Sequence, residues 1–462
     1  MLGIGQVPVF RLVLTTLNSS VSFLSVALRF LAAAALLVGL ALAQEADSGS
    51  ESIDLDALLN DDALLDQLIL DEEAPIFTED VLQSEEEPSL SSGLDSAVKP
   101  PPSAVFADES DHDVVDLLES EKLLWDWGSV VAVGGGYKRN ALFSAFDTED
   151  SAFTSLEVES TLIRISQPGE WQVFAYLLAE NKHYFDVDGL DDEWLAILIA
   201  QAEKPMGDHW RLGLAGQYTY LEQAFSLAFE EFDFGSTKIV LHQPEFTPKL
   251  EYRFLERAYL KIETPVAMNW FQDSDQNYSE LGVDVSLGAK LARGGRVELT
   301  YGYEWRDYDE RELRDRSGDS LPGESMTWRQ HQVELTVDQY LDAAKVWRTK
   351  TALRLRRVED NGAGYYDFWM YKASQRLAFE QGPWTVTAQG FYTHYDYPVQ
   401  TVSETNLNHR QRSRFAIGLE VERAFGDEWR GTAAYEFEDY LSNVVEDEYD
   451  VHVFSIGLSR SF

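Results

Sequence analysis

The sequence predicts an all-β fold, an antiparallel barrel of about 16 strands that crosses a membrane. Between Trp127 and Phe462, apolar and polar residues alternate along successive segments, which is the period of a strand with one apolar face. The links between these segments are alternately short and long, as in transmembrane barrels. Aromatic residues make up 13% of the 462 residues. Tryptophans and tyrosines gather at the segment ends, where a membrane barrel places its interface girdles.

The N-terminal residues 1–43 have the features of a secretory signal peptide. Arg29 precedes the apolar run Phe30–Leu42, and the run ends in Ala41-Leu42-Ala43. A positive flank, a short apolar core and an A-x-A end direct export and cleavage. The alternative is a retained membrane anchor, but the run is too short to span a bilayer. The mature chain is therefore expected to begin near Gln44.

Residues 44–126 are expected to form an acidic, mostly disordered periplasmic segment. They hold about two dozen carboxylates but only two bases, Lys99 and Lys122, so they cannot bury enough apolar surface to offset the entropy of ordering. Two leucine-rich stretches at helical spacing lie within this segment. These stretches predict helices that dock on a periplasmic protein or on the barrel mouth. The alternative is that they are nascent helices in a solvated tail.

Composition excludes several function classes. The formal net charge is −43, and a charge of this sign repels phosphate backbones, so nucleic acid is not an expected partner. The chain has no cysteine, which excludes disulfides, thiolate metal sites and thiol nucleophiles. Beyond the N-terminus, no run approaches the length of a membrane helix.

The strand predictions also give the direction of the side chains. Residues 296–306 place apolar and aromatic side chains on one face and charged or small ones on the other. On this basis Val297, Tyr301, Leu419 and Phe454 are expected to face lipid. The competing prediction is a soluble all-β protein. Segments of about 10–16 residues are longer than the usual strands of such proteins.

The end of the chain carries a resemblance to a known family. Phe454, Ile456, Leu458 and Phe462 alternate toward a terminal aromatic residue, although Arg460 departs from the pattern. This ending resembles the C-terminal strand of Gram-negative outer-membrane β-barrel proteins. The resemblance implies a location in the outer membrane, contact with its lipid, and recognition of the strand ending at Phe462 by the barrel-assembly machinery. The predicted strand number is similar to that of the general porins.

The polar face of the strands is expected to line the lumen, and basic residues gather on one sector of it. They are the pore-lining candidates Lys350, Arg354, Arg356, Lys372, Arg376, Arg410, Arg412 and Arg414. The third outside link holds Glu230, Glu231 and Asp233. In place and charge it is similar to the inward-folded third loop of general porins, which implies an acidic side of the constriction. Opposite charges across a wet pore create a transverse field. Alternatively, the charges form ion pairs that seal a narrow lumen.

No pattern indicates catalysis. The histidines are scattered, and neither a zinc-protease motif nor a serine-hydrolase motif is present. Gly134-Gly135-Gly136 is interpreted as a strand kink or a close contact between strands rather than a phosphate loop. The chain is therefore not expected to be an enzyme, and no catalytic residue, metal site or cofactor is predicted.

The predicted function is a channel of the outer membrane that allows passive diffusion of small polar solutes or ions. Two alternatives stay open. One is an export or assembly barrel that recruits a periplasmic partner through its acidic segment, and the other is a structural barrel with a closed lumen.

Overall fold

The computed structural model of the chain describes residues 124–144, 148–165, 169–187, 189–224, 238–272, 274–403 and 405–462. The predicted signal peptide and nearly all of the acidic segment lie outside these residues. Within the described ranges, no helix is long and apolar enough to cross a membrane.

The described residues form β-strands joined by turns, loops and three short 3-10 helices. The strands are β1 (Leu124–Arg139), β2 (Ser151–Ile165), β3 (Gln172–Tyr184), β4 (Asp192–Met206), β5 (Trp210–Ala224), β6 (Lys238–Leu255), β7 (Ala258–Glu263), β8 (Val266–Phe271), β9 (Tyr278–Lys290), β10 (Arg296–Arg314), β11 (Ser320–Tyr340), β12 (Trp347–Asp360), β13 (Phe368–Gln381), β14 (Trp384–Thr401), β15 (His409–Ala424), β16 (Trp429–Ser442) and β17 (Tyr449–Ser461). The first strand thus begins at Leu124, close to the predicted boundary at Trp127.

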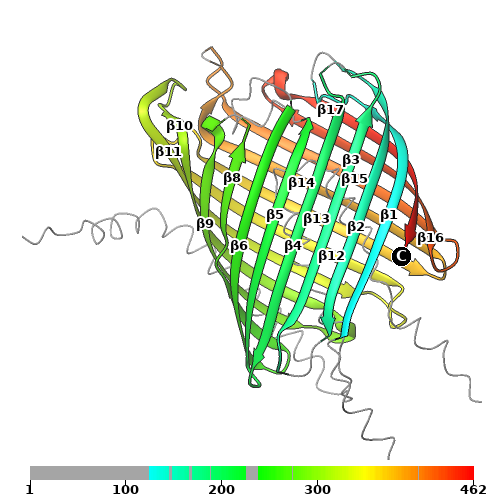
Figure 1. Cartoon of the computed structure of the whole chain (residues 1–462). Helices are drawn as coiled ribbons and strands as arrows, with labels where there is room; N and C mark the ends of the chain where they lie inside the picture. The colour runs from blue at the N-terminus through cyan, green and yellow to red at the C-terminus, as the bar shows by residue number, and fades with distance from the viewer. Residues whose placement is uncertain are drawn as a thin grey trace, which may run out of the picture.

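These strands make one closed antiparallel barrel (Figure 1). Apart from β7 and β8, each strand pairs with its neighbours in sequence, and β1 pairs with β17 to close the ring. Both β7 and β8 lie between β6 and β9. They are therefore two pieces of one position, separated at Pro265, whose nitrogen cannot donate to the ladder. The barrel accordingly has 16 strand positions, which confirms the predicted fold.

Glycines allow the closing seam to form. Ten residues of β1, Val130–Arg139, pair with His452–Ser461 of β17. At Gly134, a Cβ atom would lie 2.9 Å from the Ile456 carbonyl oxygen, and at Gly136 it would clash with the Phe454 carbonyl oxygen. The glycine run is therefore a close strand contact, as predicted. The Phe462 N–H also donates to the Ser129 carbonyl oxygen at 2.8 Å, which ties the last residue to β1.

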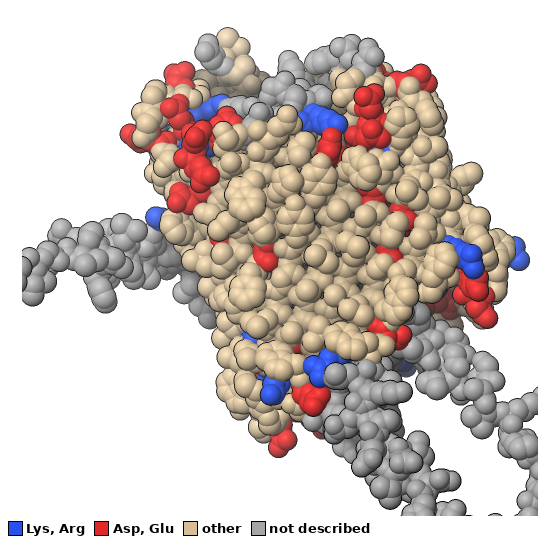
Figure 2. All heavy atoms as spheres, viewed as in Figure 1, with Lys and Arg blue, Asp and Glu red and all other residues tan. Residues whose placement is uncertain are grey.

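The outer face of the barrel is an apolar belt. Leu419 is 47% exposed and Phe454 is 54% exposed, which confirms that these side chains point outward. Val297 and Tyr301 lie on the same face, but Val297 is only 8% exposed because outer-face neighbours such as Val337 cover it. Figure 2 shows this belt in tan, between charged residues at the two ends of the barrel.

Two aromatic girdles border the belt. At the end with the short turns, outward-facing tryptophans begin four strands: Trp210, Trp347, Trp384 and Trp429. Farther along, tyrosines hydrogen-bond to histidine Nδ1 atoms on the neighbouring strand, in the pairs Tyr218–His242 (2.8 Å), Tyr301–His331 (2.9 Å) and Tyr435–His452 (3.0 Å). Three of the histidines that look scattered in the sequence, His242, His331 and His452, thus occupy corresponding places on the outer face. Amphipathic rings of this kind lie at the level of the lipid headgroups.

A charge in the belt is expected to destabilise the barrel. Leu419→Arg places a guanidinium against hydrocarbon, which costs about 2–4 kcal/mol near mid-depth. The control is Leu407→Arg, because Leu407 is 74% exposed in a loop and meets water. Urea unfolding in lipid vesicles measures both changes. Equal, small losses in the two variants would show that β15 does not face lipid.

The inner face is only partly polar, which differs from the sequence expectation. On β4, Ile197 and Ile199 point inward and are each 1% exposed, while Trp194 and Leu198 on the same strand point outward and are exposed. The inward residues pack with Leu178 and others of β3, β5 and β6 into an apolar cluster. This strand is apolar on both faces, so alternation could not reveal which residues face the interior.

Candidate functional site

The structure places the predicted basic residues on the inner wall of β12, β13 and β15. Lys350 lies opposite Arg376, and Arg354 lies opposite Lys372, in the register of β12 and β13. On β15 the inward positions alternate with exposed apolar ones such as Leu419. These inward positions include Arg410, Arg412 and Arg414, which are 3–4% exposed.

One aromatic ring joins the two groups of bases. Phe391 lies on the inner face of β14, between β13 and β15. The Lys372 Nζ lies 4.7 Å from its ring centroid, and the Arg414 Cζ lies 5.0 Å from it. Cations are attracted to the face of such a ring. The basic residues that the sequence singled out on three strands therefore form one cationic sector.

Much of this sector pairs sideways with carboxylates on neighbouring elements. The Arg354 Nε lies 2.6 Å from Glu334 on β11. The Arg414 Nε lies 2.8 Å from Glu438 on β16.

Two further arginines, Arg410 and Arg412, make ion pairs with Asp447 in the loop after β16. Arg356 instead donates from Nε to the Gln332 side-chain oxygen at 3.1 Å. Local ion pairing is the alternative that the sequence left open, and the structure shows such pairs at Arg354, Arg410, Arg412 and Arg414.

The predicted acidic partners in the third outside link, Glu230, Glu231 and Asp233, lie outside the described residues. Within the described barrel, carboxylates on the inner faces of other strands form an acidic sector that sequence reasoning missed. Its members are Glu157, Glu159, Glu180, Glu193 and Glu436. The alternation in the sequence does indicate these inward carboxylates, because Glu157 and Glu159 lie on the face of β2 opposite to that of Leu156. Only the ring closure shows that β16 and β1–β4 lie beside the cationic sector.

Two lysines lie within the acidic sector. Lys182 Nζ lies 3.1 Å from Glu180, and Lys138 Nζ lies 3.5 Å from Glu193. The latter pair joins β1 to β4 across the interior. The inner wall is thus divided into a cationic sector, an acidic sector and the apolar cluster of β3–β6.

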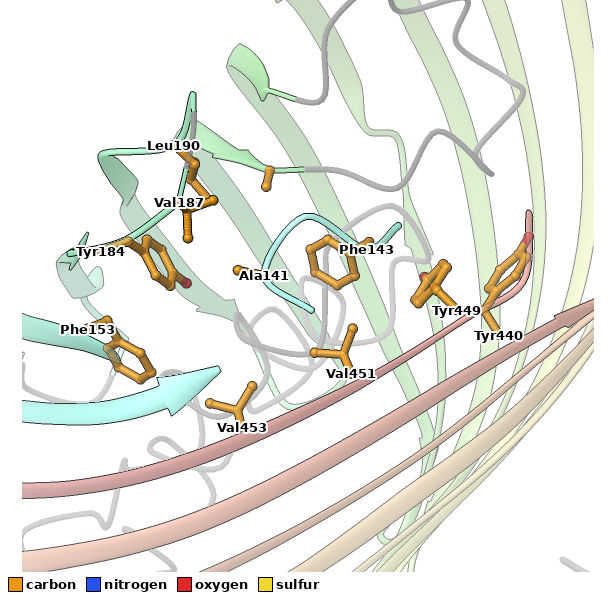
Figure 3. Close-up of a cluster of buried hydrophobic side chains, with 11 residues drawn as sticks. Ala141, Phe143, Phe153, Tyr184, Val187, Leu190, Tyr440, Tyr449, Val451 and Val453 are labelled. Atoms are coloured by element: carbon orange, nitrogen blue, oxygen red, sulfur yellow. The ribbon is translucent and has the colours of Figure 1, made fainter. Parts of the chain in front are cut away.

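The first outside loop lies at the mouth of the barrel. Ala141 and Phe143, which follow β1, are buried among side chains from β2, β17 and the loop after β3 (Figure 3). Thus the first outside loop packs inward.

These features define the class of the protein. A closed barrel with an even number of strand positions, an apolar outer belt and two aromatic girdles is the architecture of an outer-membrane β-barrel protein, embedded in membrane lipid.

No protein-family model matches the chain, and no curated protein sequence matches it. Similar solved structures include OccAB4 of Acinetobacter baumannii, with 9% identity, a TM-score of 0.41, and coverage of 74% of this chain and 100% of that one. OccK2 (OpdF) of Pseudomonas aeruginosa, in complex with glucuronate, has 11% identity, a TM-score of 0.40, and coverage of 73% and 98%. Likeness at this level does not extend to function.

Proposed function

We propose that the barrel is an outer-membrane channel for passive diffusion of small polar solutes or ions, and that the cationic sector favours anions within it. The observation that carries this proposal is the gathering of bases on the inner faces of β12, β13 and β15, two of which, Lys372 and Arg414, lie against Phe391. Barrels of this size leave room for an aqueous channel.

The electrostatic argument depends on the charges of whole strands. The inner faces of β12, β13 and β15 carry eight predicted pore-lining bases, which outnumber the carboxylates on the same faces. Sideways ion pairs with Glu334, Glu438 and Asp447 shorten the reach of this field. The acidic sector on β16 and β1–β4 lies beside it, so the potential changes across the opening.

Reversal potentials in planar bilayers test the proposal. Lys350→Glu combined with Arg376→Glu reverses two half-buried bases that lie opposite each other. We expect the reversal potential to move toward cations, and to move less at 1 M salt, where screening shortens the reach to about 3 Å.

The matched control is Arg316→Glu, since Arg316 is exposed in the turn between β10 and β11. It should leave the reversal potential unchanged. A purified barrel that never conducts would instead support the closed structural barrel. A barrel that conducts with the same reversal potential in both variants would refute the anion preference of the cationic sector.

Two partner predictions remain proposals. Exposure of the Phe462 ring at 63%, at the end of the strand that closes the seam, supports recognition by the barrel-assembly machinery. The proposed periplasmic partner of residues 44–126 concerns a segment outside the described residues.

A further inference from the structure

The first outside loop is held in a fixed turn over the mouth of the barrel. The Asn140 side-chain amide donates to the carbonyl oxygens of Ser144 and Asp450, at 2.9 and 3.0 Å. The Asn140 side-chain oxygen accepts the Ser144 N–H at 2.9 Å. Because Asp450 lies on β17, these bonds tie the loop to the opposite side of the seam.

Phe143 is the large side chain of this turn, and it points into the barrel. It is 6% exposed and meets the Tyr449 ring of β17 edge-on, with 5.5 Å between centroids. Figure 3 shows the ring between Tyr184 on one side and Tyr449 on the other. Beneath the loop lies Val451, also of β17, which is 2% exposed.

A buried ion pair lies under the ring. The Lys138 Nζ is 4.5 Å from the Phe143 ring centroid and 3.5 Å from the Glu193 Oε1. Glu193 also accepts hydrogen bonds from the Tyr184 hydroxyl at 2.6 Å and the Ala224 N–H at 3.2 Å. Glu193 therefore fixes Lys138 from β4, and Lys138 holds the aromatic ring through its charge.

The backbone at Phe143 shows that these contacts position it. Its φ is +53°, in the left-handed region that a bulky side chain rarely adopts. Such a conformation persists only where the surroundings determine it. At Phe143 the surroundings are the Lys138 ammonium group, the Tyr449 ring and the Asn140 carbonyl oxygen, which accepts a hydrogen bond from the Phe143 N–H at 3.1 Å.

We propose that Phe143 anchors the first outside loop as a constriction of this channel and that the Lys138–Glu193 pair is the latch that positions the ring. The latch holds the loop over the outer mouth, with the buried ring against β17. The term constriction rests on the proposed channel function, whereas the latched position of the loop is independent of it.

Thiol labelling tests the latch without requiring conduction. The chain has no cysteine, so Val451→Cys provides one reporter under the loop and Leu407→Cys provides an exposed reference. We expect the thiol at position 451 to react much more slowly than the thiol at 407. Adding Glu193→Gln should speed labelling at 451 by about tenfold or more, because loss of the buried partner frees the loop.

The matched control is Glu170→Gln, which removes an exposed partner of Arg164 at the other end of the barrel and should leave labelling at 451 unchanged. Heat-modifiable mobility confirms that each variant is folded. Labelling at 451 as fast as at 407 in the otherwise unchanged chain would overturn the latched loop. Labelling that stays slow in Glu193→Gln would overturn the role of the pair, and labelling that stays slow in Phe143→Ala would overturn the role of the ring.

Single-channel conductance tests the constriction. Phe143→Ala should raise conductance by about twofold or more, because the loop that the ring anchors is then free to leave the path, while Phe185→Ala, whose ring is 56% exposed, should not. Conductance that is unchanged by Phe143→Ala overturns the constriction. A barrel that never conducts, yet shows the expected labelling, refutes the channel and leaves the latch in place.

Discussion

Gly136→Ala is expected to prevent closure of the barrel. The added Cβ would overlap the Phe454 carbonyl oxygen on β17 and the Phe153 ring of β2. The ring can move, but the carbonyl belongs to the backbone ladder that pairs β1 with β17. Overpacking of this kind costs about 1–3 kcal/mol and more where backbone must shift, and here the shift falls on the seam. The measurement is the folded fraction by heat-modifiable mobility after refolding into detergent.

The control lies on the same strand. Gly128 has no atom within 4 Å of the position that its Cβ would take, so Gly128→Ala should refold as the unchanged chain does. If Gly136→Ala also refolds fully, then β1 and β17 do not approach each other as closely as the register requires.

Replacing Glu438 is expected to cause the second large loss, in the free energy of unfolding. This carboxylate is 3% exposed and accepts hydrogen bonds from Arg414 at 2.8 and 3.0 Å and from the Tyr449 hydroxyl at 2.7 Å. Glu438→Ala removes the carboxylate from a buried guanidinium, and breaking a buried pair in this way costs about 3–5 kcal/mol. Urea unfolding in lipid vesicles gives the free energy of unfolding.

An exposed pair of the same residue types provides the control. Glu428 pairs with Arg460 at 3.0 Å, and both side chains are more than 40% exposed. Glu428→Ala should therefore change the free energy of unfolding by less than about 1 kcal/mol. Replacing Arg414 and Glu438 together by methionine should recover much of the loss, because no buried charge is then left alone. Equal losses in the single and double variants would contradict the buried-pair argument.

The sequence predicted which side chains of the barrel wall face inward, because alternation along a strand gives the face on which each side chain lies. On β15, the basic residues and Leu419 fall on opposite faces in the structure, as their parity requires. The pairing of Arg354 with Glu334 was not predictable in the same way. It depends on the register of β11 against β12, and a shift of one residue would turn every side chain to the other face.

The mouth of the barrel could not be predicted from alternation at all. Ala141 and Phe143 belong to a short apolar stretch that has neither the alternation of a strand nor the spacing of a helix. Its sequence therefore predicts only a loop. Its inward packing depends on Lys138 and Glu193, which come from β1 and β4 and approach each other only across the interior. Pairs between strands that are not neighbours leave no periodic signal in the sequence.

The spacing of the two girdles sets the thickness of membrane that this protein fits. Trp210 and Tyr218 both face outward on β5 and lie eight residues apart. At about 3.4 Å per residue and a tilt of about 40°, that separation spans about 20 Å along the membrane normal. Lipids with long chains would therefore be compressed around the barrel, at a cost that grows with each ångström of hydrophobic mismatch. Short-chain lipids are accordingly the appropriate host for reconstitution, since they leave the strands near their native tilt.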